Sequence, residues 1–200
     1  MILDIAARGD YSVLKKLSYW IDHVSNGWVA LSTLIIFLLF TAFILPGQSS
    51  RAASNTGGAK SPDMSLYYTA GELYQMAEAY GEEGREAYVR ARFTFDLVWP
   101  LVYMIFLSTE ISWVYGKTFA AGSSWQYMNL MPILGAVFDY LENISTSLVM
   151  IVFPKPVPVI DMLAGVFTVA KWMFVGGSFF LLIAGIGVGL WRWVRTRGQR

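Results

Sequence analysis

The run from Gly27 to Leu45, GWVALSTLIIFLLFTAFIL, constrains this chain more than any other segment. It contains no charged residue, and its length suits the roughly 30 Å of hydrocarbon in a bilayer. Inside a bilayer the backbone polar groups must be paired within the protein, and a single apolar run achieves this as a helix. The run over 27–45 therefore predicts a membrane-spanning α-helix.

The composition of the whole chain agrees with a membrane location. Of its 200 residues, 56% are hydrophobic and 14% are charged, and the mean hydropathy is +0.48. The net charge of +1, without basic runs interleaved with aromatics, gives no case for nucleic acid as a partner. Cysteine is absent and His23 is the single histidine, which excludes disulfides and a bis-histidine haem site within the chain. We therefore expect no metal and no cofactor.

Three further segments predict helices that cross the bilayer, over residues 88–115, 130–153 and 159–193. Residues 1–26 place apolar side chains at helical spacing and predict an amphipathic helix in the membrane interface. Residues 46–87 are predicted to lie outside the membrane, with a flexible polar stretch over 46–63 and a short helix over 65–80. The predicted fold is an all-α, four-helix integral membrane bundle that ends in a basic tail over 194–200.

Basic residues near the ends of the predicted spans indicate the orientation. Cytoplasmic loops of membrane proteins carry an excess of lysine and arginine. Basic residues in three places together outnumber Lys155, which is alone between the third and fourth spans: before the first span, after the second, and from the end of the fourth span into the tail. They are Arg8, Lys15, Lys16, Lys117, Arg192, Arg195, Arg197 and Arg200. Both termini are therefore predicted to be cytoplasmic.

The third predicted span carries four polar residues on one face. Asp139, Glu142, Asn143 and Thr146 stand at i, i+3, i+4 and i+7, which at about 100° per residue places them within an arc of roughly 100°. Ionisable residues within spans usually face the bundle interior or a cavity and pair there. This stripe predicts one wall of a buried polar site.

Neighbouring spans contribute charges at a similar depth. In the second span the candidates are Tyr88, Arg92, Asp96, Trp99 and Tyr103, and Pro100 removes the normal helical partner of the Asp96 carbonyl. At about 1.5 Å per residue, Asp96, Glu142, Asn143 and Lys171 all lie roughly 12–17 Å below the outer boundary. Three acids against two bases would leave room for a shared proton, a bound cation or a cationic ligand. By contrast, Glu110 and Asp161 lie near span ends and are predicted to be solvated.

Several short motifs stand out between residue 79 and the last predicted span: AYGEEGREAY (residues 79–88), Asp96 with Pro100, the Met131–Pro132 pair, DYLEN (residues 139–143) and a lysine in the last span. Together they resemble the motifs of a group of small multi-pass bacterial and archaeal membrane proteins. The resemblance covers about residues 67–190 and agrees with a prokaryotic cytoplasmic membrane. It implies no reaction, and it implies that the following residues belong to one site: Arg85, Asp96, Asp139, Glu142, Asn143 and Lys171.

The sequence leaves several functions open. We favour a binding or accessory protein whose site holds a lipid headgroup, a small amphiphile or a cation, with membrane lipids, other membrane subunits or a second copy of the chain as partners. One alternative is an enzyme that acts on a lipid-soluble substrate, with Asp139, Glu142 and Lys171 in acid–base roles; we assign no catalytic residue otherwise. A proton- or cation-coupled carrier is another. The structural alternative is a polar staple that fixes helix register.

Overall fold

The structure, a computed structural model, describes residues 2–120 and 122–197. These ranges are all-helical and contain no strand. Three helical stretches within them are long and apolar enough to cross a bilayer, namely Gly27–Asn55, Ala70–Thr118 and Ile160–Arg197. The predictions of an all-α chain and of a membrane protein are confirmed at this level.

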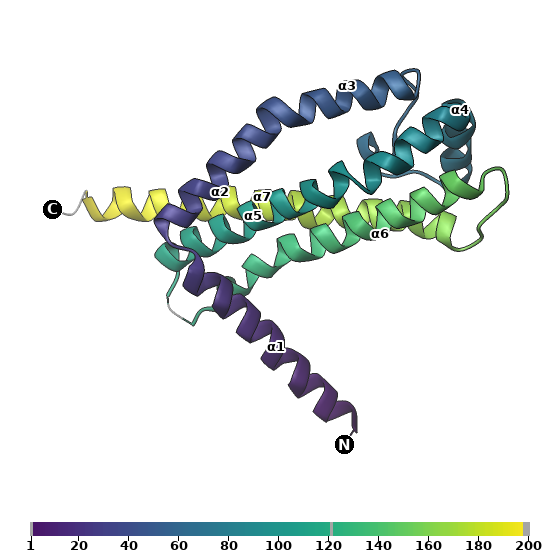
Figure 1. Ribbon diagram of the computed structural model, residues 1–200. Helices are drawn as coiled ribbons and strands as arrows, with labels where there is room; N and C mark the ends of the chain where they lie inside the picture. Colours follow the sequence, from purple (N-terminus) through teal and green to yellow (C-terminus); the bar gives the residue numbers. More distant parts are fainter. Residues whose placement is uncertain (1, 121, 198–200) are drawn as a thin grey trace.

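Helix α1 (Ile2–Val24) projects from the end of the molecule where α2 (Gly27–Leu39) begins (Figure 1). The two helices are separated by Ser25 and Asn26. The Asn26 side chain caps α2 by accepting from the backbone N–H groups of Trp28 and Val29 at 3.0 and 3.1 Å. From Val13 onward α1 buries Ile21, while its other large apolar side chains are exposed. Such an uncovered apolar face is what the predicted interfacial helix would present to lipid.

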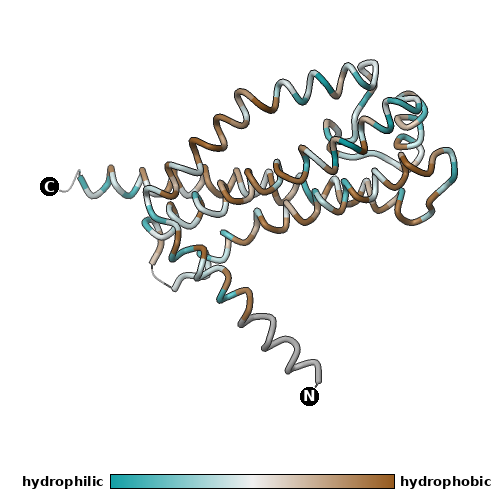
Figure 2. Tube along the Cα trace, viewed as in Figure 1, coloured by the Kyte–Doolittle hydropathy of each residue, from teal (hydrophilic) through white to brown (hydrophobic). Residues whose placement is uncertain are grey.

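The first apolar helix is longer than the sequence predicts. A π-helical turn over Phe40–Ile44 joins α2 to α3 (Leu45–Asn55), so the predicted flexible loop is wrong over its first part. Pro46 is compatible with this continuation because it lies in the first turn of α3, directly after the wider π turn. Gly57 and Gly58, both at positive φ, follow the end of the helix. Figure 2 shows the change from apolar α2 to polar α3 along it.

The predicted short helix over 65–80 and the start of the second predicted span form one element. Helix α4 (Ala70–Arg92) begins at a capping box between Thr69 and Glu72 and is interrupted at Gly81, which has a φ of 63°. After a turn at residues 93–94, α5 (Phe95–Thr118) continues the span. The predicted span over 88–115 is therefore divided between two helices, with Arg92 at the end of one and Asp96 at the start of the next.

The last two helices have bounds close to those of the segments predicted over 130–153 and 159–193, and only the second of them is among the stretches long and apolar enough to cross a bilayer. The short 3₁₀ helix η3 (Ser124–Leu130) leads into α6 (Met131–Val152), and α7 (Ile160–Arg197) extends into the predicted tail, whose residues 198–200 lie outside the described ranges. Helices α6 and α7 pack along each other, α5 packs against both, α4 packs mainly against α6, and α2 packs against α5 (Figure 1). The charged residues of interest lie where α4, α5, α6 and α7 meet.

Candidate functional site

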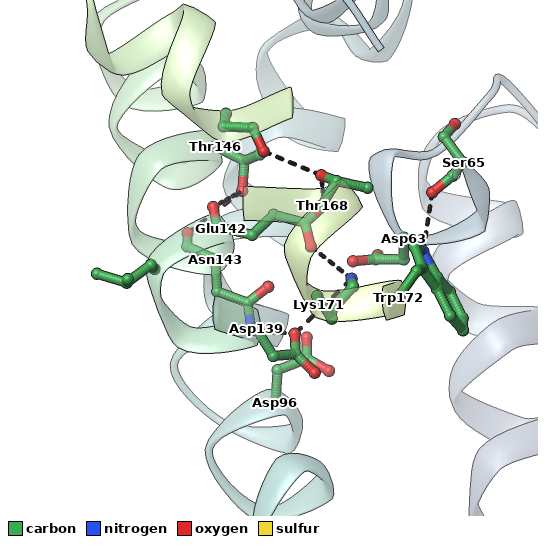
Figure 3. A network of polar contacts seen from close by, with 12 residues as sticks. Asp63, Ser65, Asp96, Asp139, Glu142, Asn143, Thr146, Thr168, Lys171 and Trp172 are labelled. Carbon is green, nitrogen blue, oxygen red and sulfur yellow. Dashed lines mark hydrogen bonds and ion pairs between the residues drawn. The ribbon is translucent and has the colours of Figure 1, made fainter. Parts of the chain in front are cut away.

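Lys171, on α7, lies between two carboxylates of α6 (Figure 3). Its Nζ forms an ion pair with Glu142 and lies 3.8 Å from Oδ1 of Asp139. The two acids can share one ammonium because residues three apart in a helix project from the same face. The Lys171 side chain is 8% exposed and that of Glu142 is 1% exposed, so this is a buried acid–base–acid group.

Glu142 has two further partners from outside its own helix. Its Oε1 accepts from the Thr168 hydroxyl at 2.6 Å and from the Tyr68 hydroxyl at 3.1 Å. Thr168 lies one turn before Lys171 on α7, whereas Tyr68 comes from the loop that precedes α4. That loop can lie against α7 because residue 165 is a glycine: a Cβ there would clash with the backbone carbonyl of Tyr68.

We expect Tyr68→Phe to lower the free energy of unfolding by about 1.5–3 kcal/mol, because it removes a hydrogen bond to a fully buried charged group. Tyr67→Phe is the matched control, since Tyr67 is adjacent in sequence and 57% exposed. The measurement is the unfolding midpoint of the purified protein in lipid nanodiscs. Equal midpoints for the two variants would show that the Tyr68 hydroxyl does not contribute to holding Glu142.

Arg92 forms a second acid–base–acid group beside the first. Its Nη1 and Nη2 donate to Oδ1 and Oδ2 of Asp63 at 2.7 and 2.5 Å, and Nη1 lies 2.8 Å from Oδ2 of Asp96. Asp63 belongs to the 3₁₀ turn η2 (Pro62–Met64), in the loop between α3 and α4. Burial acts to raise the pKa of the Asp63 carboxyl, but the positive charges of Arg92 and Lys171 outweigh it and hold that pKa below its usual value.

Asn143 links the two charged groups. Its Oδ1 accepts from Arg92 Nη1 at 3.4 Å, and its Nδ2 donates to Asp139 Oδ1 at 3.4 Å. Asp139 also accepts from the Tyr103 hydroxyl at 2.9 Å. The combined network, which we call the charged cluster, contains Asp63, Asp96, Asp139 and Glu142 as acids and Arg92 and Lys171 as bases. It therefore has four carboxylates against two cations, one acid more than the sequence indicates.

Most of the predicted site residues belong to this cluster or touch it. Tyr88 and Thr146 lie at its border: the Tyr88 hydroxyl donates to Thr146 at 3.1 Å, and the Tyr88 ring lies 4.2 Å from the Arg92 guanidinium carbon. The structure does not bring Arg85 into the cluster. Its Nη1 instead donates to the backbone carbonyl of Ala77 at 3.0 Å, and its guanidinium lies over the ring of Phe153.

Trp99 also points away from the charged cluster. Its ring stacks on Phe37 and Phe40 with centroid distances of 5.9 Å, and it meets the site only through an edge contact with Tyr103. Trp99 thus belongs to the aromatic contact between α2 and α5. Three residues absent from the sequence prediction take part in the site instead, namely Asp63, Tyr68 and Thr168.

A groove beside the charged cluster opens between the α4–α5 turn and α6. Its volume is about 320 Å³, and it is lined by Arg92, Phe93, Leu97, Tyr140, Asn143 and Ile144. Phe93, Leu97 and Ile144 are exposed, so the mouth of the groove is apolar, while Arg92 and Asn143 form its polar part. Within the part of the chain that the structure describes, Nε of Arg92 is buried and has no hydrogen-bond partner.

No protein family, curated protein or solved structure matches the chain. The resemblance over residues 67–190 therefore stays a prediction. In the described ranges, no group of three or more histidine and acidic side chains is arranged to hold a metal ion. The geometry of the cluster and of the groove is the basis for assigning a function.

Proposed function

We propose that the chain is a four-span membrane protein that binds a small amphiphile from the bilayer in the groove beside the charged cluster. The spans are the Gly27–Asn55 helix, α5, α6 and α7, and both termini lie on the cytoplasmic side of a prokaryotic cytoplasmic membrane. The assignment of α6 as a span is supported by its packing along α7 and by the pairing of both its acids with Lys171.

The observation that carries the proposal is a mostly apolar groove whose lining includes the polar residues Arg92 and Asn143. Ligand sites are typically concave and mostly apolar, with a few polar groups that fix orientation. Here the apolar lining can hold a hydrocarbon chain, and Arg92 and Asn143 are the lining residues that would meet the polar end of an amphiphile.

The charges of the cluster favour a neutral polar end. Both terminal guanidinium nitrogens of Arg92 are engaged by carboxylates, and the cluster has two carboxylates in excess of its cations. A further anion would therefore be repelled. We propose a hydroxyl or carbonyl group as the polar end, as in a fatty alcohol or a diacylglycerol. The protein would then be a binding or accessory component rather than a catalyst.

We expect a diazirine-bearing diacylglycerol in vesicles to label the groove residues, and Ile144→Trp to reduce that labelling several-fold by filling the groove. Ile151→Trp is the matched control, because Ile151 is also exposed on α6 but does not line the groove. Labelled peptides are identified by mass spectrometry. Equal labelling of both variants, or labelling spread evenly over α2, would contradict the proposed site.

The excess of carboxylates supports a second candidate, a protein that exchanges protons through the cluster. The four acids of the cluster outnumber its two cations, and closely spaced carboxylates can exchange protons with one another. We expect proteoliposomes under an imposed pH gradient to show proton flux that Glu142→Gln abolishes. Glu86→Gln is the control, because Glu86 is exposed on α4. Flux no higher than in protein-free vesicles would eliminate this candidate.

A further inference from the structure

A second cavity, which we call the junction cavity, lies where the turn between α1 and α2 meets the last part of α5. Its volume is about 440 Å³, and Asp22, Ser25, Asn26 and Gly27 line one side of it. Trp113 and Lys117 of α5 line the other. Asp96 and Lys117 are near opposite ends of α5, so the junction cavity is remote from the charged cluster and the groove.

Opposite charges line the junction cavity without pairing. In the described part of the chain, neither Asp22 nor Lys117 belongs to any of the ion pairs. The Lys117 ammonium lies 4.1 Å from the centre of the Trp113 ring, on the α5 side. The Asp22 carboxylate approaches α5 at Gly116, where an added Cβ would be 3.6 Å from Oδ1. The cavity thus has a negative and a positive group that are both available to a ligand.

We propose that the junction cavity binds a phospholipid whose headgroup carries a phosphate and a primary ammonium, as in phosphatidylethanolamine. Lys117 would contact the phosphate, and Asp22 would accept hydrogen bonds from the ammonium. A headgroup with a phosphate alone leaves Asp22 without a partner and next to a like charge. A quaternary ammonium has no N–H to donate to the Asp22 carboxylate, so phosphatidylcholine satisfies the site less well.

The surroundings of the cavity point to a lipid rather than a dissolved molecule. Tyr19, Trp20 and Trp28 lie at this end of the molecule and are 71%, 61% and 80% exposed. Exposed tryptophan and tyrosine are typical of the level of the lipid headgroups. The cavity volume also lies in the range of sites for small ligands and headgroups.

Native mass spectrometry of the purified full chain, titrated with phosphatidylethanolamine, phosphatidylcholine and phosphatidylglycerol, tests this proposal. We expect phosphatidylethanolamine to bind about tenfold more tightly than the other two lipids, and Asp22→Asn to remove that preference, a change of about 1.4 kcal/mol. Lys117→Met should weaken the binding of all three lipids, because each of them carries the phosphate. Lys16→Met is the matched control, because Lys16 is exposed on α1 and does not line the cavity. Equal binding of the three lipids, or equal effects of Lys117→Met and Lys16→Met, would overturn the proposal.

A cavity-filling variant and a competition experiment complete the test. If the charge variants do not fold, Gly116→Leu fills the cavity without changing a charge, and we expect it to weaken phosphatidylethanolamine binding by a similar factor; unchanged binding overturns the site.

Soluble glycerophosphoethanolamine tests the source of the headgroup. We expect it not to displace the lipid at millimolar concentration, and displacement would overturn a membrane lipid as the occupant. Neither outcome depends on the groove beside Arg92.

Discussion

Lys171→Met is expected to lower the free energy of unfolding by about 3–5 kcal/mol, because it removes the cation from a buried group and leaves its carboxylates unpaired. Glu142 is 0% exposed and cannot turn to solvent, and Asp139 is buried beside it. Thr168 and Tyr68 would still donate to Glu142, but two neutral hydroxyls do not replace an ammonium. For a chain of this size the loss corresponds to a fall of roughly 6–20 °C in the unfolding midpoint.

A control variant and a double variant test whether the loss of stability arises from the burial of the ion pair. Lys60→Met removes a lysine that pairs with Glu72 at 3.7 Å, but both side chains are exposed to solvent, so we expect almost no change in the unfolding midpoint. Adding Glu142→Gln to Lys171→Met removes one of the stranded charges and should recover part of the lost stability. A double variant less stable than Lys171→Met alone would contradict the assigned ion pair.

Helical spacing identifies the α6 residues of the site, because residues three or four apart share a face of a helix whatever surrounds it. Asp139, Glu142 and Asn143 share a face whatever the rest of the chain does, and their pairing with Lys171 follows from the similar depth of two spans. Thr168 carries a detectable signal as well, since it lies three residues before Lys171 and thus on the same side of α7. These parts of the cluster could be predicted from the sequence.

Loop residues at the site could not be predicted in this way. Asp63 and Tyr68 lie between α3 and α4, where no periodicity relates a residue to a depth or a face. Their positions depend on tertiary contacts, such as the close approach of the Tyr68 backbone to Gly165. The prediction that Arg85 belongs to the site is based on a sequence motif. In the structure the helix is interrupted at Gly81, and the Arg85 side chain reaches the Ala77 carbonyl instead.

Position in the sequence alone does not predict the burial of acids near the ends of the spans. Glu110 and Asp161 are predicted to be solvated, yet they are 8% and 7% exposed. Asp161 accepts from the Tyr74 hydroxyl at 3.3 Å and from the backbone N–H of Met162 at 2.7 Å. Glu110 shares a face of α5 with Phe106 and Trp113, and those two residues contact Phe37 and Gly27 of α2. These contacts place that face of α5 against α2, which hydropathy alone does not reveal.

The pairing of Arg92 bears on whether the cluster holds the fold together as well as bordering the groove. Arg92 joins the loop residue Asp63, the α5 residue Asp96 and the α6 residue Asn143. A staple role requires these contacts, whereas ligand binding requires only that the groove next to them stays open. The two roles can therefore be tested separately in Arg92 variants: the free energy of unfolding tests the structural role, and ligand labelling tests the binding role.

We expect Arg92→Met to cost about 3–5 kcal/mol of unfolding free energy, because Asp63 and Asp96 both lose their cation. Arg92→Lys should cost less, since it keeps the charge but loses the bidentate contact with Asp63. Arg90→Met is the matched control: Arg90 lies on the same helix, is exposed and forms none of the ion pairs in the described ranges. Combining Asp63→Asn with Arg92→Met should restore part of the stability, because the amide no longer strands a charge beside Asp96. Equal unfolding midpoints for Arg92→Met and Arg90→Met in nanodiscs would mean that Arg92 reaches the membrane surface instead and that the cluster is held by Lys171 alone.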